Sequence, residues 1–315
     1  IQKGLETGLA AIAANPEDSE TIRRLVRYHR TSNNEQAAED LLRSVLENPE
    51  LPGFCLARLV VLHELGRLYS DSQRFNMAVE PFDQLVQALD SRAATRLTPA
   101  QVQDIFGESE ADAYRRFGET FFNAGRFDLA IGALRRSLAY DPDSQQTPLY
   151  LAQALLRDNR AEEALALLDP IVADRPPGRV IFDVLAQVLS ALNRSEEIIP
   201  RLEQASQADP SNFLLRYALA ERYEASGRLE DARRLYRTLI SDQPDPQGLS
   251  ALAQSLREQG KLEELLRLFE TARAQRGGRM AIDAQIRFIG TDPDLAGAIL
   301  EAGLELLKAD PPGLG

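Results

Sequence analysis

The chain has 315 residues, of which 44% are apolar and 27% are charged, a balance that is typical of a folded protein. Its formal net charge of −12 argues against a general nucleic-acid-binding protein, because phosphate contacts require clustered positive charge. The single cysteine, Cys55, excludes an internal disulfide framework.

A pattern of 34 residues organises most of the chain, and its positions are counted here from Ala111. Three columns recur in four successive units without a gap: position 20 (Ala130, Ala164, Ile198, Ala232), position 24 (Leu134, Leu168, Leu202, Tyr236) and a proline at position 32 (Pro142, Pro176, Pro210, Pro244). Each unit also contains two stretches with apolar residues at helical spacing. Repeats of this length indicate a solenoid of helix pairs.

Three segments precede the gapless units. We interpret residues 1–17 as a half repeat that contributes only a second helix, and residues 18–50 as a divergent repeat. Residues 51–90 are predicted to form a further repeat, with Gly66 at position 8. The pattern therefore starts well before the four regular units.

Residues 91–110 interrupt the register and are predicted to contain a short inserted helix. Thr98 is suited to the N-cap of this helix, and Pro99 to its first position. Gln101 stands three residues after Thr98, as in a capping box.

The gapless segment, residues 111–245, is divided into four predicted repeats: 111–144, 145–178, 179–212 and 213–246. Between the two helices of each repeat, Gly or Asn is followed by Arg: Gly125–Arg126, Asn159–Arg160, Asn193–Arg194 and Gly227–Arg228. Gly and Asn tolerate the left-handed conformation that ends many helices. Acids then fall in the first turn of the second helix, where the helix dipole favours them: Asp128, Glu162, Glu196 and Glu230. We therefore predict a hinge between two helices at each of these sites.

Small residues at position 8 of the first helices are expected to let the paired helices approach closely. Gly118 is the clearest case, and we expect it to face Ala130 at position 20 of the same repeat.

The C-terminal part is less regular. Residues 246–278 are predicted to form a short repeat, and residues 279–315 an irregular helix pair with helices near 279–290 and 294–308. The last helix has leucines around much of its circumference, whereas the end of a solenoid needs a polar outer face. We therefore expect either that the native protein continues or that a partner covers this end.

The residue types that carry chemistry are few. His29 and His63 lack the spacing of a metal site and are interpreted as surface or groove residues, and Cys55 as a buried structural thiol. The basic stretch RRLVRYHR, residues 23–30, could bind an acidic segment, but a solvated helix face is the favoured interpretation. No catalytic motif is recognised, so we expect no catalytic residues, no cofactor and no metal ion.

The columns resemble the tetratricopeptide repeat (TPR) family, which has a small residue at position 8, an aromatic residue at 11 (Phe121, Tyr223), Ala at 20, a large apolar residue at 24 and Pro at 32. The resemblance implies an all-α fold, in which antiparallel helix pairs stack into a right-handed superhelix. It also implies that the first helix of each pair lines a concave groove. Positions 4, 7, 8 and 11 of that helix are expected in the core, and positions 2, 5, 9 and 12 in the groove.

The groove positions predict a partner-binding set: His63, Arg67, Arg115, Glu119, Phe122, Leu149, Gln153, Leu156, Asp183, Gln187, Tyr217 and Glu221. The amides of Gln153 and Gln187 can hydrogen-bond a peptide backbone, and the apolar members can receive apolar side chains. A chaperone-binding subgroup of the family clamps a C-terminal carboxylate with Lys, Asn and Arg. This chain lacks that combination, and its Glu119 would repel an anion.

The leading hypothesis is a non-enzymatic scaffold or adaptor that binds a protein or peptide partner in the groove. A regulatory or substrate-recruiting region of a larger enzyme is the second hypothesis, and a lattice protein that self-associates through its ends is the third. The net negative charge means that no nucleic-acid partner is expected. No membrane insertion is expected either, because no apolar run approaches about 18 residues. The strong preference for Arg over Lys suggests a bacterial source, with cytoplasm and periplasm both open.

Overall fold

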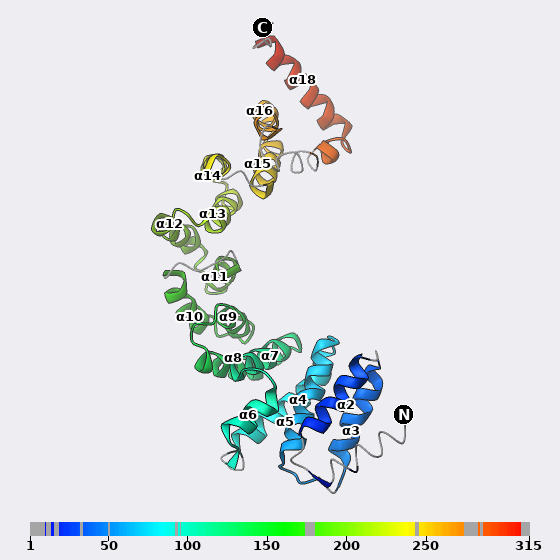
Figure 1. Ribbon diagram of the computed structural model, residues 1–315. Coiled ribbons are helices and arrows are strands. Elements are labelled where there is room, and N and C mark those ends of the chain that lie inside the picture. Colours follow the sequence, from blue (N-terminus) through cyan, green and yellow to red (C-terminus); the bar gives the residue numbers. More distant parts are fainter. Residues whose placement is uncertain are drawn as a thin grey trace. The chain divides into compact units, whose positions relative to one another are not determined.

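The computed structural model describes residues 10, 14–15, 19–31, 34–49, 51–91, 94, 96–173, 180–242, 246–273, 283 and 286–309. All regular elements within these ranges are helices, which confirms the predicted all-α class. The chain divides into two compact units, residues 1–168 and 169–315. Within each unit, most helices pack against their neighbours in the order of the chain, as in a solenoid (Figure 1).

The first unit begins with the helices of the N-terminal repeats. Its last helix, α10, runs across the boundary between the two units. Its helices are α2 (Ser19–Thr31), α3 (Glu35–Glu47), α4 (Leu56–Asp71), α5 (Phe75–Asp90), α6 (Pro99–Phe106), α7 (Glu110–Asn123), α8 (Phe127–Tyr140), α9 (Thr147–Arg157) and α10 (Ala161–Ala173). Of these, α2, α4, α7 and α9 are first helices of pairs. The half repeat predicted for residues 1–17 lies almost wholly outside the described residues.

The short helix predicted in the insertion is α6, and its start is the predicted one. The Thr98 hydroxyl accepts a hydrogen bond from the Gln101 backbone N–H, and the Gln101 side chain accepts one from the Thr98 backbone N–H. Pro99 is the first residue of the helix. This capping box confirms the prediction, and α6 packs against α4 and α7.

The second unit continues the alternation of first and second helices. Its elements are α11 (Val180–Ala191), the 3-10 turn η2 (Ser195–Glu197), α12 (Ile198–Ala208), α13 (Phe213–Ala225), α14 (Leu229–Asp242), α15 (Pro246–Glu258), α16 (Leu262–Arg273) and α18 (Pro293–Ala309). The helix predicted over 294–308 is therefore confirmed as α18. The helix predicted near 279–290 falls mainly outside the described residues, although 286–289 are helical.

First helices end in one recurring backbone arrangement. The residues with positive φ include Gly125 (74°), Asn159 (60°), Asn193 (57°) and Gly227 (79°), which confirms the predicted left-handed positions. The N–H of the following residue then donates back to a carbonyl five residues earlier, for example from Arg126 to Phe121 at 2.8 Å. The same bond recurs after α2, α4, α9, α11, α13 and α15. This pattern is the Schellman motif, which satisfies carbonyls that the helix end leaves unpaired.

The core is built from the columns that define the repeat. The position 24 side chains of Leu134, Leu168 and Tyr236 are fully buried. Cys55 is also buried, as predicted. The expectation that Gly118 faces Ala130 is wrong, because a Cβ at Gly118 would collide with the side chain of Leu134. Gly66 lies in the same way against Phe82, the residue at position 24 of its repeat. The missing side chain thus makes room for a large residue and not for the backbone of the second helix.

Candidate partner-binding site

The predicted groove residues of α4 do not form an open surface, because α6 covers part of this helix. His63, at position 5, has no solvent exposure, and its ring contacts those of Phe106 in α6 and Phe117 in α7. The prediction that His63 lies in the groove or at the surface is therefore wrong. The repeat pattern places this side chain on the face of α4 that the insertion then covers. His29 is also buried rather than exposed, with 8% of its surface accessible.

The environment of His63 holds its ring in the neutral form. Burial, together with the charges of Arg67, Arg23 and Arg116, lowers the pKa of His63 from 6.5 to about 3. Neither ring nitrogen has a hydrogen-bond partner. The nearest carboxylate oxygen is that of Glu108, 3.9 Å from Nε2, and the two oxygens of Glu108 already accept hydrogen bonds from Arg116.

Arg67, at position 9 of α4, lines a pocket of about 500 Å³ between α2, α4 and the end of α6. The remaining lining residues are Glu20, Arg23, Val26, Arg27, Arg30, Thr31, Glu64 and Gly107. We call this the arginine pocket. It unites one predicted groove residue with three arginines of the basic stretch, so the interpretation of residues 23–30 as a wholly solvated face is wrong.

Ion pairs fix the floor and one wall of the arginine pocket. The Arg23 side chain is only 13% exposed, and it donates to Asp104 at 2.7 Å and to the carbonyl of Ile105, the penultimate residue of α6, at 3.0 Å. Arg30 pairs with Asp71 at 2.7 Å. These contacts connect α2 with α6 and with α4.

The buried carboxylate of Glu64 lies between two arginines of the pocket. One oxygen lies 3.7 Å from Arg23 Nε and the other 3.4 Å from Arg67 Nη2. Both Nε atoms are buried without a hydrogen-bond acceptor. The exposed Arg27 has no ion-pair partner among the described residues. The pocket thus contains guanidinium groups whose hydrogen-bonding capacity is not used.

The predicted groove residues of α7 and α9 are accessible, although some of them pair with each other. Arg115 and Glu119 form an ion pair of 2.6 Å on α7, which occupies both side chains. Phe122, Leu149, Gln153 and Leu156 are all half-buried. The core positions of the same helices, such as Phe117 and Leu151, are buried.

In the second unit the predicted groove residues separate into paired, buried and accessible ones. Asp183 on α11 accepts a hydrogen bond from Arg222 on α13 at 3.0 Å, so it links two first helices. Tyr217 is only 8% exposed, and its ring lies 6.3 Å from that of Tyr236. Its prediction as an open groove residue is wrong, because it packs on the position 24 side chain of its own repeat. Gln187 is exposed and Glu221 is half-buried.

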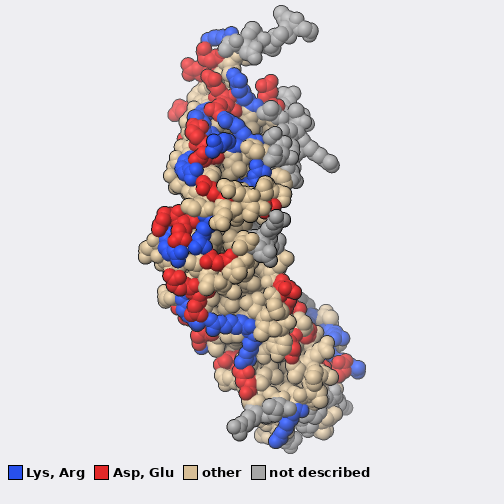
Figure 2. All heavy atoms as spheres, turned by 90° about the vertical axis from the view of Figure 1, so that its left-hand side faces the viewer, with Lys and Arg blue, Asp and Glu red and all other residues tan. Residues whose placement is uncertain are grey.

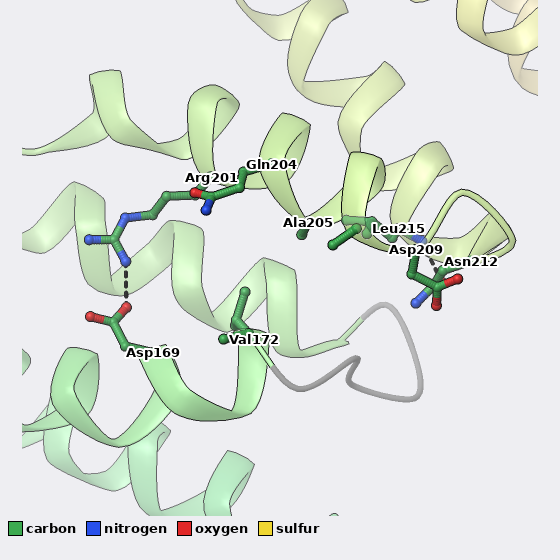
Figure 3. Close-up of a pocket in the computed structure, with 10 residues that line it drawn as sticks. Asp169, Val172, Arg201, Gln204, Ala205, Asp209, Asn212 and Leu215 are labelled. Carbon is green, nitrogen blue, oxygen red and sulfur yellow. Dashed lines mark hydrogen bonds and ion pairs between the residues drawn. The ribbon is translucent and has the colours of Figure 1, made fainter.

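A separate pocket of about 230 Å³ lies in the second unit between α10, α12 and the start of α13 (Figure 3). Val172, Ala205 and Leu215 contribute apolar walls, and an ion pair joins Arg201 to Asp169 at one side. Because α10 and α12 are second helices, this pocket does not lie on the predicted groove face. No pattern in the sequence points to this pocket.

Other kinds of site find little support within the described ranges. No group of three or more His, Cys, Asp or Glu side chains in these ranges could hold a metal ion. Basic and acidic side chains are interspersed on the face drawn in Figure 2. None of the described helices has the length and apolar character needed to cross a membrane.

Comparison with known proteins identifies the repeats. Residues 121–188 and 189–255 match the family model described as tetratricopeptide repeat, so the chain contains TPR repeats. Human protein O-mannosyl-transferase TMTC1 is 22% identical over 219 residues, which are 68% of this chain and 22% of that protein. Cellulose synthase operon protein C of Pseudomonas fluorescens (strain SBW25) is 27% identical over 240 residues, 67% of this chain and 19% of that protein. The chain thus spans about a fifth of the length of either relative.

Solved structures also include similar chains at low identity. The structure of YrrB, described as a TPR protein with an unusual peptide-binding site, has a TM-score of 0.45 and is 16% identical. The match covers 67% of this chain and 96% of that one.

Proposed function

We propose that the chain is a non-enzymatic scaffold that holds a protein or peptide partner against its first helices. The observation that carries this proposal is the accessibility of Phe122, Leu149, Gln153 and Leu156 on α7 and α9. A stripe that mixes apolar side chains with an amide suits a peptide, because apolar groups anchor side chains and the amide bonds the backbone. Gln187 on α11 offers a second amide.

The experiment is a cross-linked pull-down from native lysate with two matched double variants. Gln153→Arg with Gln187→Arg places bulk and charge on two first helices. Gln84→Arg with Gln207→Arg makes the same chemical change on two second helices, at two exposed positions. We expect the first variant to lose a partner that the wild type and the second variant retain. Equal capture by all three proteins would refute binding on the first helices.

A repeat region that recruits substrate to a larger enzyme is the second candidate. It is supported by the similarity to part of a protein named as an O-mannosyl-transferase, of which the matched segment is about a fifth. Determining the boundaries of the native gene product tests it. A catalytic domain in the same polypeptide would favour this candidate, and the absence of such a domain would argue against it.

Self-association through the C-terminal end is the third candidate. Leu300, Leu304 and Leu307 follow one another at helical spacing on α18 and are 70%, 59% and 55% exposed. Exposed apolar stripes of this kind mark contact surfaces. Sedimentation over a wide concentration range tests the idea, since a constant monomer mass would exclude it.

A further inference from the structure

We propose that the arginine pocket receives a carboxylate of an acidic peptide segment, so that the partner of this scaffold carries Asp or Glu where it reaches α2 and α4. The inference rests on the proposed function, because it names the chemistry of one part of the partner. Its basis is the set of unused guanidinium donors in the pocket and the position of Arg67 in the predicted groove.

Arg67 is the central group. Its one described ion-pair contact is with Glu64 at 3.4 Å, and its Nε is buried without an acceptor. Because this Nε is closed to solvent, a ligand would reach the guanidinium through its terminal Nη groups, and the side chain is 32% exposed. A guanidinium presents its donors as a planar fork that matches the two oxygens of a carboxylate.

The arrangement of charges favours one anionic group of modest charge. Glu64 is shared by Arg23 and Arg67, and Arg23 also pairs with Asp104, whereas the lining as a whole has four arginines against the two carboxylates of Glu20 and Glu64. Arg27 adds an exposed cation that has no ion-pair partner within the described residues. The Glu64 carboxylate would repel a polyphosphate or a doubly charged phosphate more strongly than a single carboxylate.

The pocket is also prepared for binding, because its walls are fixed before a ligand arrives. Arg23 is held by Asp104 and by the carbonyl of Ile105 on α6, and Arg30 by Asp71 on α4. Groups that are already positioned lose little conformational entropy on binding. The inserted helix therefore contributes to the proposed site by orienting Arg23 of α2.

The probe is a fluorescein-labelled hexaglutamate peptide, with hexaglutamine as the uncharged control, titrated with the full chain by fluorescence anisotropy. We expect hexaglutamate to bind and hexaglutamine not to bind. Arg67→Gln should raise the Kd at least tenfold, and Arg27→Gln, which changes an exposed residue and leaves folding intact, at least threefold. The matched control is Arg135→Gln on α8, since Arg135 is exposed, pairs with Glu163 away from the pocket and should change the Kd less than twofold.

Three outcomes would overturn the inference. The first is equal binding of the two peptides, and the second is an equal loss in the Arg135, Arg27 and Arg67 variants, which would indicate non-specific attraction. The third is displacement of hexaglutamate by inorganic phosphate at an equal charge concentration, which would assign the pocket to phosphate.

The two proposals can fail separately. If hexaglutamate binds but the Gln153 and Gln187 double variant keeps every partner, the arginine pocket stands and the proposed partner binding on the first helices fails. If hexaglutamate does not bind but the double variant loses a partner, only the pocket proposal fails.

Discussion

The first helices α4 and α7 occupy equivalent places in successive repeats of the first unit, but their groove positions have different fates. In both helices, glycine at position 8 makes room for the large residue at position 24. At position 5, however, α4 has a fully buried His63 and α7 has a half-exposed Arg115 that pairs with Glu119. The difference comes from α6, whose Phe106 packs on His63.

The comparison teaches that a repeat position determines which way a side chain points but not whether solvent reaches it. Core positions are buried in both helices because the partner helix of the same pair always covers them. Groove positions depend on the neighbouring elements, and an insertion changes those neighbours. Two experiments can test this difference between α4 and α7, and two more can test features that the repeats share.

The largest expected effect follows from removing the aromatic side chain of α6 that covers His63. Phe106→Ala deletes a buried aromatic side chain that contacts His63 and Phe117, and such truncations cost about 3–5 kcal/mol. We expect hydrogen exchange by mass spectrometry to show lost protection in α6 and α4. The control is Phe122→Ala on α7, a half-buried phenylalanine, which should leave exchange in α6 unchanged. Unaltered protection of α4 in the Phe106 variant would contradict the role assigned to the insertion.

The second effect is a pH dependence that only the covered position should produce. The folded chain keeps His63 neutral down to about pH 3, whereas the unfolded chain takes up a proton near the ordinary pKa of 6.5. Unfolding is therefore favoured as the pH falls, and at 1.36 kcal/mol per pKa unit the loss between pH 7 and pH 4.5 is about 3 kcal/mol.

The measurement is urea unfolding followed by circular dichroism at several pH values, in the wild type and in His63→Gln. Other titrating groups are common to both proteins, so the difference between the two curves isolates His63. If the unfolding free energies of the two proteins run parallel against pH, the pKa of His63 is not lowered in the folded state, and the covered position of its ring is contradicted.

The third effect is one that α4 and α7 should share. Gly66→Ala and Gly118→Ala each place a methyl group against the side chain at position 24, which is Phe82 in one repeat and Leu134 in the other. Overpacking a dense core costs about 2 kcal/mol, so both variants should have a lower urea midpoint. Gly132→Ala is the control, because it lies within α8 with open space around its Cβ and should gain about 0.5–1 kcal/mol. A shift of the same sign in all three variants would be inconsistent with these contacts.

The smallest effect concerns the hinge that all the regular repeats share. Asn159 has a φ of 60°, and an alanine there should lower stability by about 1 kcal/mol. Asn159→Gly should be nearly neutral, because glycine adopts this conformation without strain. Thermal midpoints of the two variants provide the test, and equal midpoints would mean that the left-handed conformation does not limit the residue type.

Local backbone features could be predicted from the sequence because short-range chemistry determines them. Thr98 and Gln101 form the predicted capping box, and Gly125 and Asn159 adopt the predicted left-handed conformation. In both cases the relevant partners are within a few residues, so no knowledge of the tertiary structure was needed.

The candidate site could not be predicted to the same extent, because it depends on contacts between distant segments. The sequence places His63 at a groove position but does not show that residues of the insertion will cover it. In the same way, nothing near Arg23 indicates that its partners are Asp104 and Glu64. The pairing of Asp183 with Arg222 likewise requires two neighbouring repeats.

The recurring hinge has a consequence for how such a chain can change during evolution. The bond from the Arg126 N–H to the Phe121 carbonyl fixes the number of residues between the two helices of a pair, and equivalent bonds do so in six further pairs. The segment that contains α6 enters instead between α5 and α7, where one pair joins the next. Additions at such junctions leave every helix pair with its own hinge intact. Lineages of this architecture can therefore acquire new recognition surfaces by lengthening the junctions while the inherited repeats stay unaltered.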